Sequence, residues 1–364
     1  MDHFAFMGDL GVNAATQYSN GTPLTDALYG VRYFMSAKDF DPKDIEANPD
    51  KMYFYRFTDR FDLHRYFTDK VYEDKRYVVY KNPNSFPLAY GTNSLVRNIQ
   101  FGANNAFANQ NIILNSMEGH QKANNDTVEY FKPLAFSSIE TENVIEEKVN
   151  KETGEAIYKR ADSSKDAIIR YKVTPRTNYT YYFFTPVSLI QNQDYSVLLN
   201  NKWLLNAKIF TQRQIWQLTD QTENQETVIE FRFRTDHIDM SNAGVYRADV
   251  DQIQQVLENR KKQGLQVTKF SNTHIVGDVS ITDDSNYMMT SIPYSDGWKV
   301  KVDGKFVKTE KAWNAFLSFP ISKGNHKVEF VFRQKGVILG ALLSIVSVAY
   351  LVIQMRRSRS NEGQ

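Results

Sequence analysis

Near its C-terminus the chain carries twenty residues without a charge, Gly336 to Met355, which read GVILGALLSIVSVAYLVIQM. At 1.5 Å per residue a helix of this length is about 30 Å long, the thickness of the hydrocarbon core of a bilayer. A helix buried in a protein core usually keeps a polar face, and this segment has none. We therefore expect a single C-terminal transmembrane helix over 336–355 and a basic tail over 356–364.

Small residues recur within this apolar segment. Gly336, Gly340 and Ser344 are spaced four apart, so they fall on one stripe of the expected helix. Such a stripe lets helix backbones approach closely in a membrane. It indicates transmembrane packing against other helices.

The composition of the 364 residues limits what else the chain can be. Hydrophobic residues make up 41% and charged residues 24%, and the mean hydropathy of −0.51 excludes several further spans within these residues. Lys and Arg total 44 against 42 Asp and Glu, a formal net charge of +2. That balance leaves no basic footprint for a nucleic acid, so we expect no nucleic-acid partner.

The reactive residue types are also limited. The chain has no cysteine, which excludes disulfides, thiol nucleophiles and Fe–S clusters. Its six histidines show no metal-binding spacing, and neither a phosphate loop nor a GxSxG motif is present. We therefore expect no metal and no cofactor, and we assign no residue a catalytic role.

The orientation of the chain is left open by its N-terminus, which has no basic segment followed by an apolar one and so does not resemble a signal peptide. Two alternatives follow. The protein is tail-anchored and faces the cytoplasm, or the chain is the end of a longer polytopic protein whose other spans export it.

Aromatic and β-branched runs predict a β-rich (α+β) fold. Residues 1–127 read as a mixed α/β region, with strands at 52–58 and 71–80 and a helix over 104–117 closed by Gly119. From 128 to 333, short strands separated by turns every 8–12 residues are typical of a jelly-roll-like β-sandwich. One helix, about 251–262, interrupts that pattern, with Asp251 as its expected N-cap.

One hairpin is well defined by the sequence at 298–309. Asp303-Gly304 is a two-residue type I′ turn signal, and it puts Trp298, Val300, Val302 and Val307 on one apolar face. The turn is therefore interpreted as structural, and replacement of Asp303 by Asn is expected to be nearly silent.

Candidate ligand-binding residues are few. Trp313 and Tyr294 are candidates for stacking on a glycan ring, whereas hairpin parity places Trp298 in the core. The run 283–286 (DDSN) fits an ordinary turn better than a calcium loop, since no Gly and bidentate Glu follow at the required spacing.

Several segments together resemble the C-terminal end of the YfhO-type bacterial membrane proteins. Near the C-terminus these are SIPYSDGW (291–298), VDGK (302–305) and KGNHK (323–327), followed by a basic turn and one final span. Earlier in the chain TPLTDALYGVRY (22–33), NPN (82–84) with PLAY (87–90), and NAFANQN (105–111) are similar in the same order.

The resemblance implies a polytopic, GT-C-like envelope glycosyltransferase. Such proteins are thought to move sugar from an undecaprenyl-phosphate carrier onto envelope polymers, including lipoteichoic acid. Their catalytic acidic residues lie in an early extracytoplasmic loop that has no counterpart here, so no catalytic position is carried over. The implied location is the cell membrane, with the bulk of the chain extracytoplasmic and the C-terminus cytoplasmic, and the chain would be a partial product.

On this interpretation the fragment recognises the acceptor polymer or braces the membrane part, without chemistry of its own. The expected partners are membrane lipid, transmembrane helices of the N-terminal part of the parent protein, a polyprenyl-phosphate sugar and a teichoic-acid-type acceptor. A membrane-anchored carbohydrate-binding or cell-wall interaction module is the alternative, and a cytoplasmic tail-anchored protein is a third.

Overall fold

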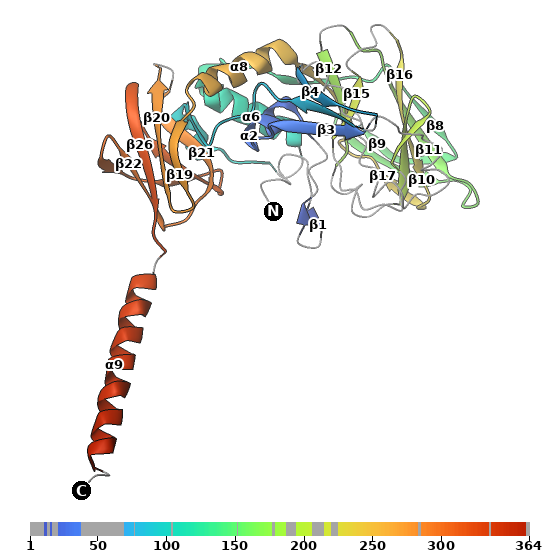
Figure 1. The fold of residues 1–364 in the computed structure, drawn as a ribbon. Helices are drawn as coiled ribbons and strands as arrows, with labels where there is room; N and C mark the ends of the chain where they lie inside the picture. The colour runs from blue at the N-terminus through green and yellow to red at the C-terminus, as the bar shows by residue number, and fades with distance from the viewer. Residues whose placement is uncertain are drawn as a thin grey trace.

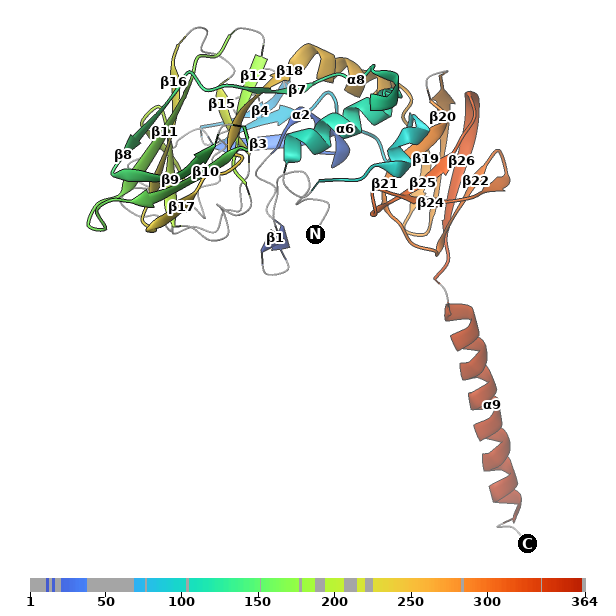
Figure 2. The same cartoon turned by 180° about the vertical axis from the view of Figure 1, so that it is seen from behind.

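The computed structural model describes residues 11–12, 15–16, 21–37, 69–75, 77–102, 105–150, 152–176, 179–186, 194–205, 215–219, 225–282, 285–334 and 336–361. Figure 1 shows two strand-rich bodies with helices between them and one long helix that leaves the molecule toward the C-terminus. Figure 2 shows the same arrangement from behind. The strand expected at 52–58 lies outside the described residues.

The first sandwich is built from the middle of the chain. Its five-stranded antiparallel sheet has the order β14 (Lys202–Leu205), β13 (Tyr195–Leu199), β16 (Thr227–Phe233), β11 (Ala167–Val173) and β8 (Ser138–Glu142). The four-stranded sheet has the order β15 (Ile215–Thr219), β12 (Tyr179–Phe184), β18 (Gly244–Asp249) and β7 (Phe131–Leu134). A smaller sheet adds β17 (His237–Asp239), β10 (Glu155–Arg160) and β9 (Val144–Asn150).

Strand alternation explains how these two larger sheets pack. In β11 every second side chain from Ala167 to Val173 is buried, as expected for a strand with one face on a core. Tyr171 of β11 meets Phe183 of β12 at a ring separation of 5.0 Å, which joins the sheets across that core. Strand β12 is buried on both faces, because Tyr182 on its other side contacts Phe107 of the helical layer.

The second sandwich is built mainly from the C-terminal third. One sheet has the order β19 (Gln266–Ser271), β20 (His274–Ile281), β26 (Gly324–Phe332), β22 (Trp298–Val302) and β23 (Lys305–Val307). The other has the order β24 (Glu310–Ala312), β25 (Phe316–Pro320), β21 (Tyr287–Pro293) and β6 (Ala89–Thr92). Phe319 and Phe330 meet across the core with ring centroids 5.8 Å apart.

The division of the strands differs from the single sandwich expected over 128–333. Strands of that region belong to two sandwiches, and β6, from before residue 127, completes the second by pairing with β21. The spacing of turns shows where strands lie but not which strands pair, because pairing is decided by distant segments.

A helical layer lies between the sandwiches (Figures 1 and 2). It contains α2 (Pro23–Leu28), η1 (Ser94–Asn98), α6 (Ala106–Glu118), η2 (Lys122–Asn124) and α8 (Val250–Lys262). Its buried apolar side chains form one cluster with Tyr182 of the first sandwich and Tyr287 of the second. The layer therefore joins the two bodies through a common core.

The helix ends follow capping rules. Asn105 caps α6 by accepting from the backbone N–H groups of Phe107 and Ala108, and Gly119 ends it with φ +84°. The prediction of this helix is confirmed. The N-cap of α8 is Asp249 and not the expected Asp251, because the Asp249 carboxylate accepts from the Gln252 N–H. Helix α8 therefore begins two residues earlier than predicted.

A smaller sheet, β3 (Tyr33–Ala37), β5 (Tyr77–Lys81) and β4 (Asp69–Glu73), covers the start of α8. Its buried side chains Val78 and Tyr80 cluster with Val250. Strands β1 (Gly11–Val12) and β2 (Ala15–Thr16) form a separate two-residue ladder near the N-terminus.

Helix α9 (Val337–Asn361) follows β26 after a short connection and projects away from both sandwiches (Figure 1). Its apolar side chains are exposed, among them Ile345 at 65% and Val346 at 64%. Among the residues described, none of the helices meets the length and hydrophobicity that a membrane crossing requires. The transmembrane span over 336–355 stays a prediction.

Candidate functional site

The candidate site lies on the outer face of the five-stranded sheet of the second sandwich. Alternation along β26 turns Val328 and Phe330 into the core, so Lys327 and Glu329 point outward. Along β20, Ile275 is likewise buried while His274 and Val276 face the other way. Side chains from neighbouring strands therefore meet on this outer face.

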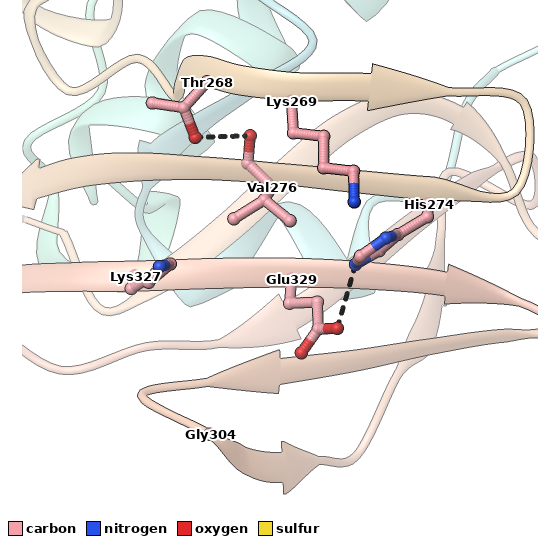
Figure 3. Close-up of a pocket in the computed structure, with 7 residues that line it drawn as sticks. All are labelled: Thr268, Lys269, His274, Val276, Gly304, Lys327 and Glu329. Atoms are coloured by element: carbon pink, nitrogen blue, oxygen red, sulfur yellow. Dashed lines mark hydrogen bonds and ion pairs between the residues drawn. The ribbon is translucent and has the colours of Figure 1, made fainter.

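A pocket of about 420 Å³ occupies that face. Seven residues from β19, β20, β26 and the turn after β22 line it (Figure 3), namely Thr268, Lys269, His274, Val276, Gly304, Lys327 and Glu329. Backbone pairing fixes their order, because Lys269 lies opposite Val276 and Val276 lies opposite Glu329.

Glu329 stands in the middle of the pocket and is held by the side chains of Lys301 and His274. Lys301 Nζ lies 3.0 Å from Glu329 Oε2, and His274 Nε2 lies 2.9 Å from Glu329 Oε1 (Figure 3 draws the His274 contact). The hydrogen bond from Lys301, and then that from His274, lowers the pKa of the Glu329 carboxyl. Glu329 is therefore an ionised, already paired group.

Two lysines of the pocket are differently placed. Within the described part of the chain, neither Lys269 nor Lys327 forms an ion pair through its side chain, although Asp278 lies opposite Lys327 in the ladder. The lining thus holds two lysines and one carboxylate, Glu329, which Lys301 already pairs from outside the lining. A site of this kind attracts anions.

The hairpin turn closes one end of the pocket. Asp303 and Gly304 both have positive φ, +51° and +79°, between the paired residues Val302 and Lys305. The Asp303 carboxylate accepts from His326 Nδ1 at 2.7 Å and from the Lys327 N–H at 2.9 Å. The side chain of Asp303 thus ties the turn to β26.

This tie perturbs both ionisable groups. The hydrogen bond from His326, followed by that from the Lys327 backbone, lowers the pKa of Asp303. Partial burial of the His326 imidazole disfavours its charged form, but the hydrogen bond and charge of Asp303 outweigh burial and raise the pKa of His326.

The candidate glycan-binding residues lie away from the pocket. Trp313 is only 5% exposed and packs between Phe101 and Phe316, so its ring offers no free face to a sugar, and this interpretation is corrected. Tyr294 packs on the core of the second sandwich and its hydroxyl lies 3.2 Å from Asp296. A role of Tyr294 in glycan binding stays a prediction.

The residues proposed for transmembrane packing are on α9. A side chain at Gly336 or Gly340 would meet nothing within 4 Å, and the Ser344 hydroxyl donates to the Gly340 carbonyl within the helix. No described element of the chain packs on the stripe. Asp283 and Asp284 lie outside the described residues.

Sequence reasoning did not identify the pocket. Its residues are separated by up to 61 positions, from Thr268 to Glu329, and form no motif. The alternation of charged with apolar residues in β22 and β26 was a usable signal for a charged outer face. The partner strands β19 and β20, which supply Lys269 and His274, could not be deduced from that alternation.

Comparison with known proteins gives a family match over most of the chain. The family model described as "Bacterial membrane protein YfhO" matches residues 1–344. The "Uncharacterized protein YfhO" of Bacillus subtilis (strain 168) is 26% identical over 121 residues, which are 33% of this chain and 14% of that protein. The match thus covers far less than two thirds of the relative's length.

Solved structures show only distant likeness. The exo-β-D-glucosaminidase CsxA is 12% identical, with 47% of this chain and 21% of that chain covered and a TM-score of 0.19. A β-glucuronidase from Ruminococcus gnavus is 8% identical, with 57% and 46% covered and a TM-score of 0.20. Scores this low carry no argument about fold or function.

Proposed function

The chain belongs to the YfhO family of bacterial membrane proteins, and from this membership we propose that it forms the C-terminal, extracytoplasmic part of a cell-envelope glycosyltransferase. The parent protein would transfer sugar from a polyprenyl-phosphate carrier to an envelope polymer such as lipoteichoic acid. The transfer activity rests on the resemblance of the chain to that family.

Helix α9 is the observation that carries the membrane part of the proposal. Its exposed apolar residues point in all directions around the helix axis, with Leu342 at 55%, Leu343 at 60%, Ile345 at 65%, Val348 at 60% and Leu351 at 57% exposure. A surface of this extent requires lipid or protein around it. We assign 336–355 as the final transmembrane helix, with the second sandwich at the membrane surface.

We assign this part of the protein to acceptor recognition or to bracing of the membrane domain. A general base needs a free lone pair and a pKa near the working pH. The carboxylate of the pocket, Glu329, is engaged by Lys301 and His274 and has a lowered pKa. This pairing supports a non-catalytic role for the pocket.

Membrane topology tests the proposal. A single cysteine is placed at Ser360 or at Asp303 of a full-length parent protein made free of other cysteines, and intact cells are treated with a membrane-impermeant maleimide. We expect labelling at position 303 and none at position 360 until the cells are permeabilised. Labelling at 360 but not at 303 would contradict the orientation.

Activity is tested on the purified chain itself. Residues 1–364 should transfer no sugar from a polyprenyl-phosphate donor to poly(glycerol phosphate), whereas the full-length parent serves as the positive control. Time-dependent transfer by the 364-residue chain, lost when one of its own acidic residues is replaced, would show that chemistry resides here.

A further inference from the structure

The outer face of the second sandwich concentrates lysines. Strand alternation directs Lys299 and Lys301 of β22 and Lys327 of β26 outward, and Lys269 of β19 joins them through its pairing with Val276. Two carboxylates share this face: Glu329, which Lys301 and His274 already contact, and the exposed Asp278, which lies opposite Lys327 in the ladder but forms no ion pair with it among the described residues. Lys269 and Lys327 therefore remain as cations available to an external anion.

We propose that the pocket between Lys269 and Lys327 binds a phosphodiester group of an anionic polymer chain. This proposal deepens the proposed function and rests on it for the extracytoplasmic location of the polymer. The volume of about 420 Å³ is within the usual range for small-molecule sites, and it accommodates a phosphate together with one neighbouring polyol unit.

The chemistry of the lining suits a phosphate anion. The pocket presents lysines and no arginine. A lysine ammonium group binds phosphate as a point charge, and its three donors rotate freely, so it needs no fixed approach geometry. Val276 provides an apolar contact surface within the pocket. Gly304 has no side chain to narrow the entrance, and the space around its Cα is open, because a Cβ built there would meet nothing within 4 Å.

The position of the pocket favours a polymer over a lipid headgroup. Strand β26 runs from Gly324 to Phe332 and then leads to α9. Lys327 lies five residues before the end of the strand, and at about 3.4 Å per residue it is about 17 Å from that end. Lys269 lies level with Glu329 through Val276, three residues or about 10 Å from that end. Since the headgroup layer on each side of a bilayer is about 5–8 Å thick, both lysines are accessible to a chain that extends away from the membrane.

Binding is measured with the full chain in phosphatidylcholine nanodiscs and a fluorescein-labelled synthetic poly(glycerol phosphate), by fluorescence anisotropy. The double variant Lys269→Gln/Lys327→Gln should weaken binding about tenfold, the effect expected for two exposed ion pairs. The matched variant Lys159→Gln/Lys311→Gln removes two exposed lysines on other sheets and should bind as the parent chain does. Circular dichroism confirms that both variants are folded.

A second variant tests the sign of the ligand charge. Glu329→Gln removes the negative charge and releases Lys301 and His274, so polymer binding should tighten. Loss of binding in Glu329→Gln, or equal binding by the two double variants, would overturn the proposal.

A third comparison separates the two sources of phosphate. Nanodiscs that contain phosphatidylglycerol should bind the labelled polymer as phosphatidylcholine nanodiscs do. Competition by phosphatidylglycerol that depends on Lys269 and Lys327 would identify a headgroup site and overturn the assignment to a polymer. This assay measures polymer binding and not membrane orientation. If the polymer does not bind, the orientation found by cysteine labelling still stands. If the labelling contradicts the orientation, the measured affinity for the polymer still stands.

Discussion

Arg260 holds the helical layer to the second sandwich, and its replacement provides the most direct test of the architecture. The side chain is completely buried. Its Nη1 donates to Ser285 Oγ at 2.7 Å and approaches the Gly91 carbonyl at 3.4 Å, while Nη2 lies 3.2 Å from Glu118 Oε1. One guanidinium thus links α8 to α6, to β6 and to the segment before β21.

The variant Arg260→Met retains much of the volume but removes the charge and the donors. Glu118, whose side chain is 19% exposed, then loses its charged partner, and the Ser285 hydroxyl and the Gly91 carbonyl lose a donor. Breaking a mostly buried ion pair from one side costs about 3–5 kcal/mol. At about 2–4 °C per kcal/mol for a body of this size, the melting temperature should fall by roughly 10 °C.

Thermal unfolding followed by circular dichroism measures this shift, with Lys262→Met as the control, because Lys262 is an exposed cation two residues further along the same helix. The double variant Arg260→Met/Glu118→Met should recover part of the loss, since it removes both charges together. If Arg260→Met unfolded within 2 °C of the parent, or if the double variant lost the sum of the two single effects, the buried link would not be the stabilising contact described above.

Three further predictions concern the second sandwich. Gly304→Val should lower the melting temperature through backbone strain of about 1–3 kcal/mol, because φ is +79° while a side chain there meets nothing within 4 Å; Gly304→Asn, which tolerates this conformation, should lose less. Gly297→Ala should destabilise by steric conflict, since its Cβ would lie 2.7 Å from the Phe332 ring, and a differential-scanning melting temperature equal to that of the parent would contradict this geometry. The Asp303–His326 pair should stabilise the chain most between about pH 4 and 6.5. Because the pKa of His326 is raised in the folded chain, its contribution is lost as the pH rises through that folded pKa. Because the pKa of Asp303 is lowered, its contribution is lost as the pH falls through the folded pKa of Asp303. The melting temperature should be less dependent on pH in Asp303→Asn, and an unchanged profile in that variant would show that the pair does not contribute.

The structure revises one expectation about the hairpin. The sequence predicts that Asp303→Asn is nearly silent, because the type I′ turn needs only a residue that tolerates positive φ. The carboxylate of Asp303, however, accepts from both His326 and the Lys327 backbone. An Asn can retain the contact with the Lys327 backbone but loses the negative charge beside the imidazole. We therefore expect Asp303→Asn to lower the melting temperature measurably at a pH below the pKa of His326.

Local features were accessible from the sequence because short-range chemistry determines them. The helix predicted over 104–117 and closed by Gly119 is α6, and the run from Trp298 to Val307 forms the predicted hairpin with its apolar face toward the core. Several short segments of the sequence also predicted that the chain belongs to a family of membrane proteins, and the family match over 1–344 confirms this prediction.

Long-range pairing was decided only by the tertiary structure. The sequence cannot show that β6 joins β21, or that Lys269 and Glu329 lie on one face with Val276 between them. Strand periodicity determines which side chains share a face, but the choice of partner strand depends on how much apolar surface distant segments bury together. For the same reason Trp313, which lies in a segment apolar on both faces, was left as a candidate for sugar binding until packing between Phe101 and Phe316 placed it in the core.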